Sequence, residues 1–244
     1  MDVKKAFLRS SRTIMVALVE LSEFTIVGHT SQLNILSVHV QHKEQYEGCE
    51  LPVVQAIRRI GPHEFNVFKK LYNESAVILA YSWLDAYLNE IEEIMYLASP
   101  ETLGDSVQVK LGKILSSVTI DDLVHDIAKR KVREKGQWGL KNRLHDLRDS
   151  HDVLSNTSDA DLEWMSTLRN NIVHNRRVSA LKTHKRKVIY SAVEGIALSG
   201  DDANRYRKLC LRIMASVYRS SAKALGITLK TPMHRTNLKL IHEW

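Results

Sequence analysis

Three side chains that can act on a phosphate group stand close together between Arg169 and His174, in the run Arg-Asn-Asn-Ile-Val-His. Histidine has the unperturbed pKa closest to neutral pH, so His174 can accept a proton under physiological conditions. Arg169 carries a planar, permanently charged fork that matches a phosphate. Asn170 can hold either the imidazole or the phosphate by hydrogen bonding. This combination indicates acid–base chemistry at a phosphate, with no metal ligand set.

The residues around this segment have the spacing of an amphipathic helix. Apolar residues recur at intervals of three and four and define one stripe, made of Met165, Leu168 and Ile172. At about 100° per residue, Asn170 and His174 point roughly 160° to 200° away from Ile172, and Arg169 lies about 60° to one side. The pattern predicts a helix that buries the stripe and turns its polar groups away from its own core.

A basic stretch follows the helix, and no acidic residue occurs between Trp164 and Val193. Side chains of this kind make sequence-independent contacts with nucleic-acid phosphates. The predicted phosphate-binding residues are Arg176, Arg177, Lys182, Lys185, Arg186 and Lys187. The alternative is an ordinary solvated helix whose Arg pairs with a carboxylate.

The hexapeptide resembles the Arg-polar-x3-His signature of the HEPN superfamily, whose all-helical domains often act as metal-independent ribonucleases in toxin and defence systems. A second segment, residues 73–88, resembles the long early helix of that family, in which an acidic residue precedes a small and an aromatic one. Asp85 stands where the family more often has Glu. The resemblance covers roughly residues 63–226.

The resemblance implies a homodimer in which both copies of Arg169, Asn170 and His174 line one cleft. Residues assigned supporting roles are Asp85, Asn171 and Asn175. Attack by the RNA 2′-hydroxyl would give a 2′,3′-cyclic phosphate and a 5′-hydroxyl, with no metal and no cofactor. A positioned general base contributes about 10² to 10⁴ in rate. A toxin-antitoxin or phage-defence context implies an antitoxin or another partner in a defence complex.

Two other readings compete with this one. Three His-Asp dipeptides resemble those of metal-dependent HD phosphohydrolases: His125-Asp126, His145-Asp146 and His151-Asp152. Such sites also need a further His well upstream and an Asp well downstream that converge on the metal, and this order is not evident in the chain. The other reading is a non-catalytic, HEPN-like dimer that binds RNA, a nucleotide or a protein partner, since fold does not impose function.

The composition favours a mostly helical protein. The chain of 244 residues has 44% hydrophobic residues, which can supply a core, and only 10 Gly and 4 Pro, which suits long helices. A formal charge of +7 favours polyanionic partners such as RNA. Cys49 and Cys210 do not form a disulfide framework, and no uninterrupted apolar run reaches the length of a membrane span. We therefore expect a soluble, cytoplasmic protein.

We expect an all-α fold, with an up-down HEPN-like bundle of four or five helices over residues 63–226. Residues 1–62 are expected to form a small, irregular or partly β extension, with a helix over Lys4–Leu21 and a strand over Leu36–Val40. Residues 227–244 are expected to form a loose tail. Gly61-Pro62 is the predicted boundary between the extension and the bundle.

Within the bundle, the longest apolar pattern predicts a central helix from His63 to Ala98, ended by Ser99-Pro100. Its acidic end, Asn89–Glu93, and the basic residues between Lys129 and Arg148 are expected to be solvated or salt-bridged at the surface. A second helix is expected to begin at Asp121-Asp122 and to be interrupted at Gly136 or Gly139. The helix that carries Arg169 is expected to have its N-cap at Ser158 or Asp159. A small hairpin over 187–198 and a last helix over Ala203–Ala224, ended by Gly226, are expected to follow.

Overall fold

The computed structural model describes residues 2–36, 62–104, 119–179 and 198–229, together with a few single positions between residues 54 and 117. Within the helices, the side chains at positions 34, 36, 62–64 and 174–179 are not described. The described residues form six α-helices and one short 3-10 helix, with no strand among them. The prediction of an all-α fold is confirmed.

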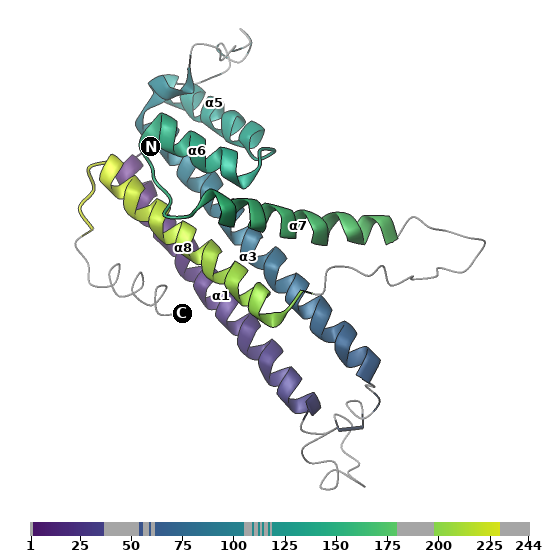
Figure 1. The fold of residues 1–244 in the computed structure, drawn as a ribbon. Coiled ribbons are helices and arrows are strands. Elements are labelled where there is room, and N and C mark those ends of the chain that lie inside the picture. The colour runs from purple at the N-terminus through teal and green to yellow at the C-terminus, as the bar shows by residue number, and fades with distance from the viewer. Residues whose placement is uncertain are drawn as a thin grey trace.

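Three long helices run side by side and form the body of the molecule: α1 (Val3–Leu36), α3 (Pro62–Ala98) and α8 (Gly200–Ala224) (Figure 1). The start of α1 lies beside the ends of α3 and α8, so α1 runs antiparallel to both. The central helix was predicted over His63–Ala98, and α3 confirms it. It ends before Pro100, which begins the 3-10 helix η2 (Pro100–Leu103).

The helix α1 is longer than the segment expected over Lys4–Leu21, and it contributes to the same core as α3 and α8. Phe7 stacks on Tyr218 of α8 with ring centroids 4.7 Å apart. The expectation of a partly β N-terminal extension is wrong for the part the structure describes, because Leu36, the first residue of the expected strand, is the last residue of α1. Val38 and Val40 lie outside the described residues, and the division of the chain at residue 62 stays a prediction.

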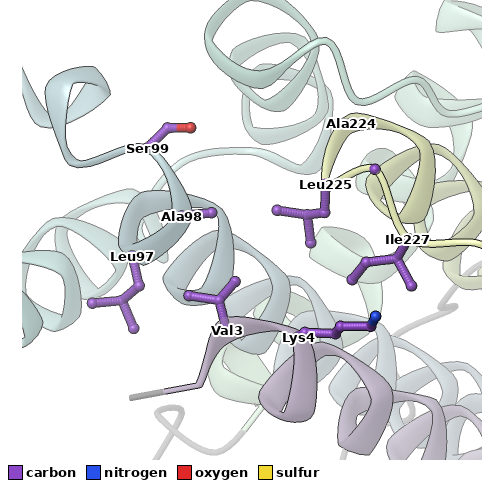
Figure 2. A pocket seen from close by; sticks show the side chains of 9 residues that line it. Val3, Lys4, Leu97, Ala98, Ser99, Ala224, Leu225 and Ile227 are labelled. Atoms are coloured by element: carbon purple, nitrogen blue, oxygen red, sulfur yellow. The ribbon is translucent and has the colours of Figure 1, made fainter.

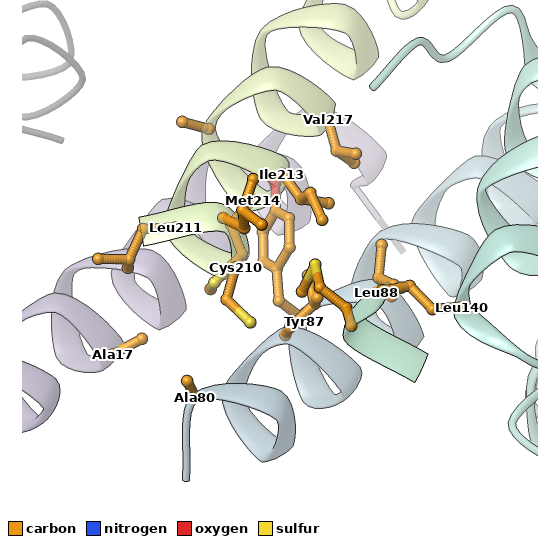
Figure 3. Packing of buried hydrophobic residues seen from close by; sticks show 14 of the residues in the cluster. Ala17, Ala80, Tyr87, Leu88, Leu140, Cys210, Leu211, Ile213, Met214 and Val217 are labelled. Carbon is orange, nitrogen blue, oxygen red and sulfur yellow. The ribbon is translucent and has the colours of Figure 1, made fainter. Parts of the chain in front are cut away.

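Figure 3 shows the centre of this core, where small residues of α1 and α3, Ala17 and Ala80, face the apolar side of α8. The predicted stripe of α8 is buried: Leu209, Ile213, Val217 and Tyr218. Tight packing of this kind leaves little room for added atoms. The helix α8 begins with a capping box between Ser199 and Asp202.

The helix α8 ends in a Schellman motif, because the amide of Ile227 donates to the carbonyl of Ala222 and that of Gly226 to Lys223. Gly226 has a φ of 62°, a left-handed conformation in which glycine carries no steric penalty. The predicted stop at Gly226 is confirmed.

The shorter helices α5 (Ile120–Lys135), α6 (Leu140–His151) and α7 (Asp159–Ser179) complete the described fold. The helix α5 has two acids in its first turn, as predicted, but its N-cap is Thr119, whose side chain accepts from the amide of Asp122. Gly136 closes α5 and Gly139 precedes α6, so the predicted interruption is confirmed. The hairpin predicted over 187–198 and most of the tail lie outside the described residues.

Residues Val3–Leu33 of α1 have the length and apolar content of a membrane-spanning helix, although core helices of soluble proteins meet the same criterion. One face of α1 packs against α3 and α8 in this structure. The cytoplasmic location stays a prediction.

Candidate functional site

The helix α7 carries the predicted site and has the orientation expected from its apolar stripe. Its buried side is formed by Leu162, Met165, Leu168 and Ile172. Ser158 caps the helix, since its hydroxyl accepts from the amide of Asp161 at 3.2 Å. Figure 1 shows α7 crossing α3, with its C-terminal end projecting beyond the other described helices. The second half of α7 therefore extends away from the bundle.

Arg169 is half-buried and is held by two contacts. Its Nη1 donates to Oδ1 of Asn170 at 3.0 Å, and its guanidinium carbon lies 5.1 Å from the centroid of the Tyr81 ring on α3. A guanidinium over an aromatic face is attracted by the ring quadrupole and loses part of its rotamer freedom. Asn170 itself is exposed. Arg169 is therefore oriented by its own protomer while its neighbouring amide faces outward.

Tyr81 connects Arg169 to a group of charged side chains on α3 and α6. Burial raises the pKa of the Tyr81 hydroxyl above its ordinary value, the negative charge of Asp85 raises it further, and the positive charges of Arg169 and Arg143 oppose this shift. Asp85 and Arg169 thus act on the same phenol, although no hydrogen bond is described between them. Tyr81 and Asp85 lie four residues apart, one turn of α3.

Asp85, predicted to support the site, is paired with Arg143 of α6 and not with Arg169. Its Oδ1 accepts from Nη1 of Arg143 at 2.6 Å. Arg143 also donates to Asn89 at 2.8 Å and to both oxygens of Glu92, at 3.0 and 2.9 Å. These four hydrogen bonds join the guanidinium to successive turns of α3, and the Arg143 side chain is only 2% exposed. The Arg143 cluster fixes α6 to α3 beside the candidate site.

This cluster corrects two sequence expectations. The end of α3 around Asn89–Glu93 was expected to be solvated, but Glu92 is 1% exposed because α6 covers it. The basic residues between Lys129 and Arg148 were expected on the surface, whereas Lys135 and Arg143 are buried. Lys135 donates to Tyr96 and Asp146. One sequence pattern could have predicted the cluster. Asp85, Asn89 and Glu92 follow one another at intervals of four and three residues, so they lie on one face of an otherwise apolar helix.

The other predicted site residues are only partly described. Asn171 is half-buried. The backbone of α7 continues through residues 174–177, so positions 170 and 174 lie one turn apart on an uninterrupted helix, but the side chains of His174, Asn175, Arg176 and Arg177 are outside the described set. The rest of the predicted phosphate-binding residues lie wholly outside it: Lys182, Lys185, Arg186 and Lys187.

A second Arg–aromatic stack lies one turn before the site and was not predicted. The guanidinium of Arg205 on α8 lies 4.5 Å from the ring centroid of Trp164, and it donates to Asp161 at 2.8 Å. Hydrogen bonds from Ser158 and Arg205 lower the pKa of Asp161. The guanidinium of Arg169 therefore lies against Tyr81 where α7 meets α3, and that of Arg205 lies against Trp164 where α7 meets α8.

The three His-Asp dipeptides do not converge. His125 pairs with Glu93 at 3.3 Å, and His145 with Asp159 at 3.1 Å. His151 is buried with its ring edge-on to Tyr96. Among the described residues, no three His, Cys, Asp or Glu side chains are grouped to hold a metal ion.

A pocket of about 530 Å³ lies where the start of α1 meets the ends of α3 and α8 (Figure 2). Val3, Leu97, Leu225 and Ile227 are among the residues that line it, together with Lys4 and Ser99. None of the predicted site residues whose side chains the structure describes contributes to this pocket. Lys4 is the one charged residue among the described residues that line this pocket.

In the comparisons with known proteins, no family model, curated protein or solved structure matches the chain.

Proposed function

We propose that this protein is a metal-independent endoribonuclease of the HEPN type, built on a HEPN-like helical bundle. In this proposal α7 meets α7 of a second copy, and both copies of Arg169, Asn170 and His174 line one RNA-binding cleft. The setting is cytoplasmic, as a toxin with a neutralising antitoxin or as a component of phage defence.

The observation that supports the proposal best is the position of Arg169. Its guanidinium is oriented by the Tyr81 ring and by Asn170, yet the side chain remains half exposed next to an exposed amide. A structural arginine would be expected to pair with a carboxylate, as Arg143 does. Arg169 instead faces an aromatic ring and an amide, which leaves its positive charge available to a phosphate.

Each residue has one task in the proposed reaction. His174 removes the proton from the 2′-hydroxyl, and the 2′-oxygen attacks the adjacent phosphorus. Arg169 stabilises the charge that builds on the non-bridging phosphate oxygens. The bond to the 5′-oxygen breaks, and this oxygen leaves as a hydroxyl after taking up a proton. Asn170, one turn before His174, holds the imidazole or the phosphate in line.

Asp85 acts in this proposal as a positioning residue. Its carboxylate is held by Arg143, one helical turn from Tyr81, and both its negative charge and the positive charge of Arg169 act on the Tyr81 hydroxyl. The supporting roles proposed for Asn171 and Asn175, and phosphate binding by Arg176, Arg177 and the lysine-rich segment that follows, belong to the same proposal.

The test is cleavage of mixed RNAs by the purified protein in EDTA. The wild type is expected to cut, and Arg169→Ala and His174→Ala are each expected to lose about 10² to 10⁴ in rate while keeping their helical circular dichroism. Matched controls are Arg148→Ala, an exposed arginine paired with its neighbour Asp149, and His125→Ala, from one of the His-Asp dipeptides. Both controls are expected to cut at the wild-type rate.

The outcomes separate the alternatives. Equal cleavage by wild type and by both site variants would reject the assignment, and activity that disappears with EDTA would favour the metal-dependent reading. RNA binding without any cleavage would favour a non-catalytic module.

A further inference from the structure

The outward face of α8 carries five exposed basic side chains, and beyond its first turn the helix contains no acidic residue. The five side chains lie within about 60° of one another around the helix and extend over about 27 Å of its length. They form the α8 row: Arg205, Lys208, Arg212, Arg219 and Lys223. The row is a strip of positive charge that is one helix wide.

Most of the charge on the α8 row is not neutralised by carboxylates. Arg205 pairs with Asp161 at 2.8 Å. Among the residues that the structure describes, no carboxylate forms an ion pair with the next members of the row, Lys208, Arg212 and Lys223. The bases on α6 differ in this respect, because Lys141 and Arg148 both pair with carboxylates. The row can therefore attract a polyanion and displace the counterions of that polyanion.

The first member of the row lies next to the candidate site. The guanidinium of Arg205 is 4.5 Å from the ring centroid of Trp164, and the Arg205 side chain is 58% exposed. Trp164 lies on α7 five residues before Arg169, which is about 7.5 Å along the helix axis. Guanidinium planes and aromatic rings are the usual stacking partners of unpaired RNA bases. The row therefore leads to α7 and meets it at a group on which a base can stack.

The surroundings of the row indicate which polyanion fits. A helix that lies on a lipid surface needs large apolar side chains next to its basic ones, and none of the exposed large hydrophobic residues of the described chain lies on α8. A nucleic-acid duplex presents two backbones, whereas a strip one helix wide follows one. An acidic protein segment has no base to place on Arg205. A single strand of nucleic acid satisfies all three conditions.

We propose that the α8 row binds the phosphate backbone of single-stranded RNA and leads it to α7, with a base stacked on Arg205 where the two helices meet. This inference rests on the proposed function, because it names the form of the same substrate and the path that it takes. It adds a second binding surface to the basic residues predicted after His174.

Binding of a single-stranded 2′-O-methyl oligonucleotide, which attack by a 2′-hydroxyl cannot cut, tests the row apart from cleavage. The affinity of the full-length protein is measured by fluorescence anisotropy at several salt concentrations. Lys208→Gln combined with Arg212→Gln is expected to weaken binding about 25-fold at 0.1 M salt and to reduce the slope of log K against log salt by about 1.4, since two phosphate contacts are lost. The matched control is Lys129→Gln combined with Arg133→Gln, an exposed pair with the same spacing on α5, which is expected to bind as the wild type does.

Arg205→Lys tests the stacked base. The substitution keeps the positive charge but removes the planar group, so it is expected to weaken binding about fivefold without changing the salt slope. Duplex RNA of the same sequence and a poly-glutamate chain are the competing ligands. Both are expected to bind the wild type less tightly than the single strand.

Equal affinities and salt slopes in the α8 variant and in the α5 control would overturn the inference, as would wild-type affinity in Arg205→Lys. Duplex RNA bound as tightly as the single strand would also overturn it, and poly-glutamate bound as tightly would indicate an acidic protein as the partner. The nuclease proposal can fail separately. A wild type that binds the single strand through the row but cuts no RNA would reject the nuclease and support the row, whereas a wild type that cuts RNA with no help from the row would do the reverse.

Discussion

Replacing Arg143 with methionine is expected to destabilise the fold strongly. The change keeps most of the aliphatic volume but removes the hydrogen-bond donors that now reach Asp85, Asn89 and Glu92. Glu92, 1% exposed, would be left as a buried carboxylate without its charge partner. Breaking a buried ion pair from one side typically costs about 3 to 5 kcal/mol. In a domain of this size that lowers Tm by roughly 6 to 20 °C.

The dependence on pH gives this prediction a second readout. Burial raises the pKa of Glu92, and Arg143 opposes that shift, so removal of the guanidinium leaves the pKa higher still. A carboxyl whose folded pKa exceeds its unfolded value is most favourable to folding when it is protonated, at low pH. That contribution is lost as the pH rises through the folded pKa. The stability gap between wild type and Arg143→Met is therefore expected to widen towards neutral pH, once the pH has risen above the raised pKa of Glu92 in the wild type.

Urea unfolding followed by circular dichroism at several pH values measures both effects. The matched control is Arg148→Met on the same helix, because the exposed guanidinium of Arg148 pairs with the adjacent Asp149 and its loss is expected to change stability little. Adding Glu92→Met to Arg143→Met is expected to recover much of the loss, because an apolar pair replaces an orphaned charge. The reasoning is refuted if Arg143→Met unfolds at the same urea concentration as Arg148→Met.

Three further changes test other parts of the structure. Gly28→Ala is expected to lower the free energy of unfolding, measured with urea, by about 1 to 3 kcal/mol, because a Cβ there would lie 1.9 Å from the Tyr72 ring. Wild-type stability in this variant would show that α1 and α3 do not pack as described. Burial lowers the pKa of His151, so the stability of the wild type is expected to fall as the pH drops below about 6.5. His151→Phe should make stability depend less on pH in this range. An unchanged pH dependence in the variant would contradict the role given to His151. Tyr81→Leu is expected to slow RNA cleavage by releasing Arg169, whereas Tyr81→Phe should retain it; equal rates would remove Tyr81 from the account.

Much of the fold could be predicted from local sequence, because helices are set by local spacing and caps. The stripe of α7, its N-cap at Ser158 and the stop at Gly226 all depend on residues within a few positions of each other. The extent of α1 was underestimated because its local spacing is ambiguous. Its two apolar rows, one buried and one exposed, blur the single-face pattern by which an amphipathic helix is recognised.

The site could be predicted only as far as residue types and helix register. The contact between Arg169 and Tyr81 and the pairing of Asp85 with Arg143 join α3 to α7 and to α6 across long stretches of chain. Such contacts depend on how helices cross, which local periodicity does not specify. Glu92 and Arg143 were assigned to the surface because charged residues are mostly exposed, and only their mutual pairing explains their burial.

The most direct test of the proposed chemistry uses one RNA that the protein cuts and the same RNA with a single 2′-deoxy nucleotide at the cleavage site, both in EDTA. The wild type is predicted to release a fragment with a 2′,3′-cyclic phosphate from the first, identified by mass spectrometry, and to leave the second intact at that position. His174→Ala should cut neither. Equal cleavage of both RNAs, or fragments carrying a 5′-phosphate, would contradict attack by the 2′-hydroxyl and with it the role proposed for α7.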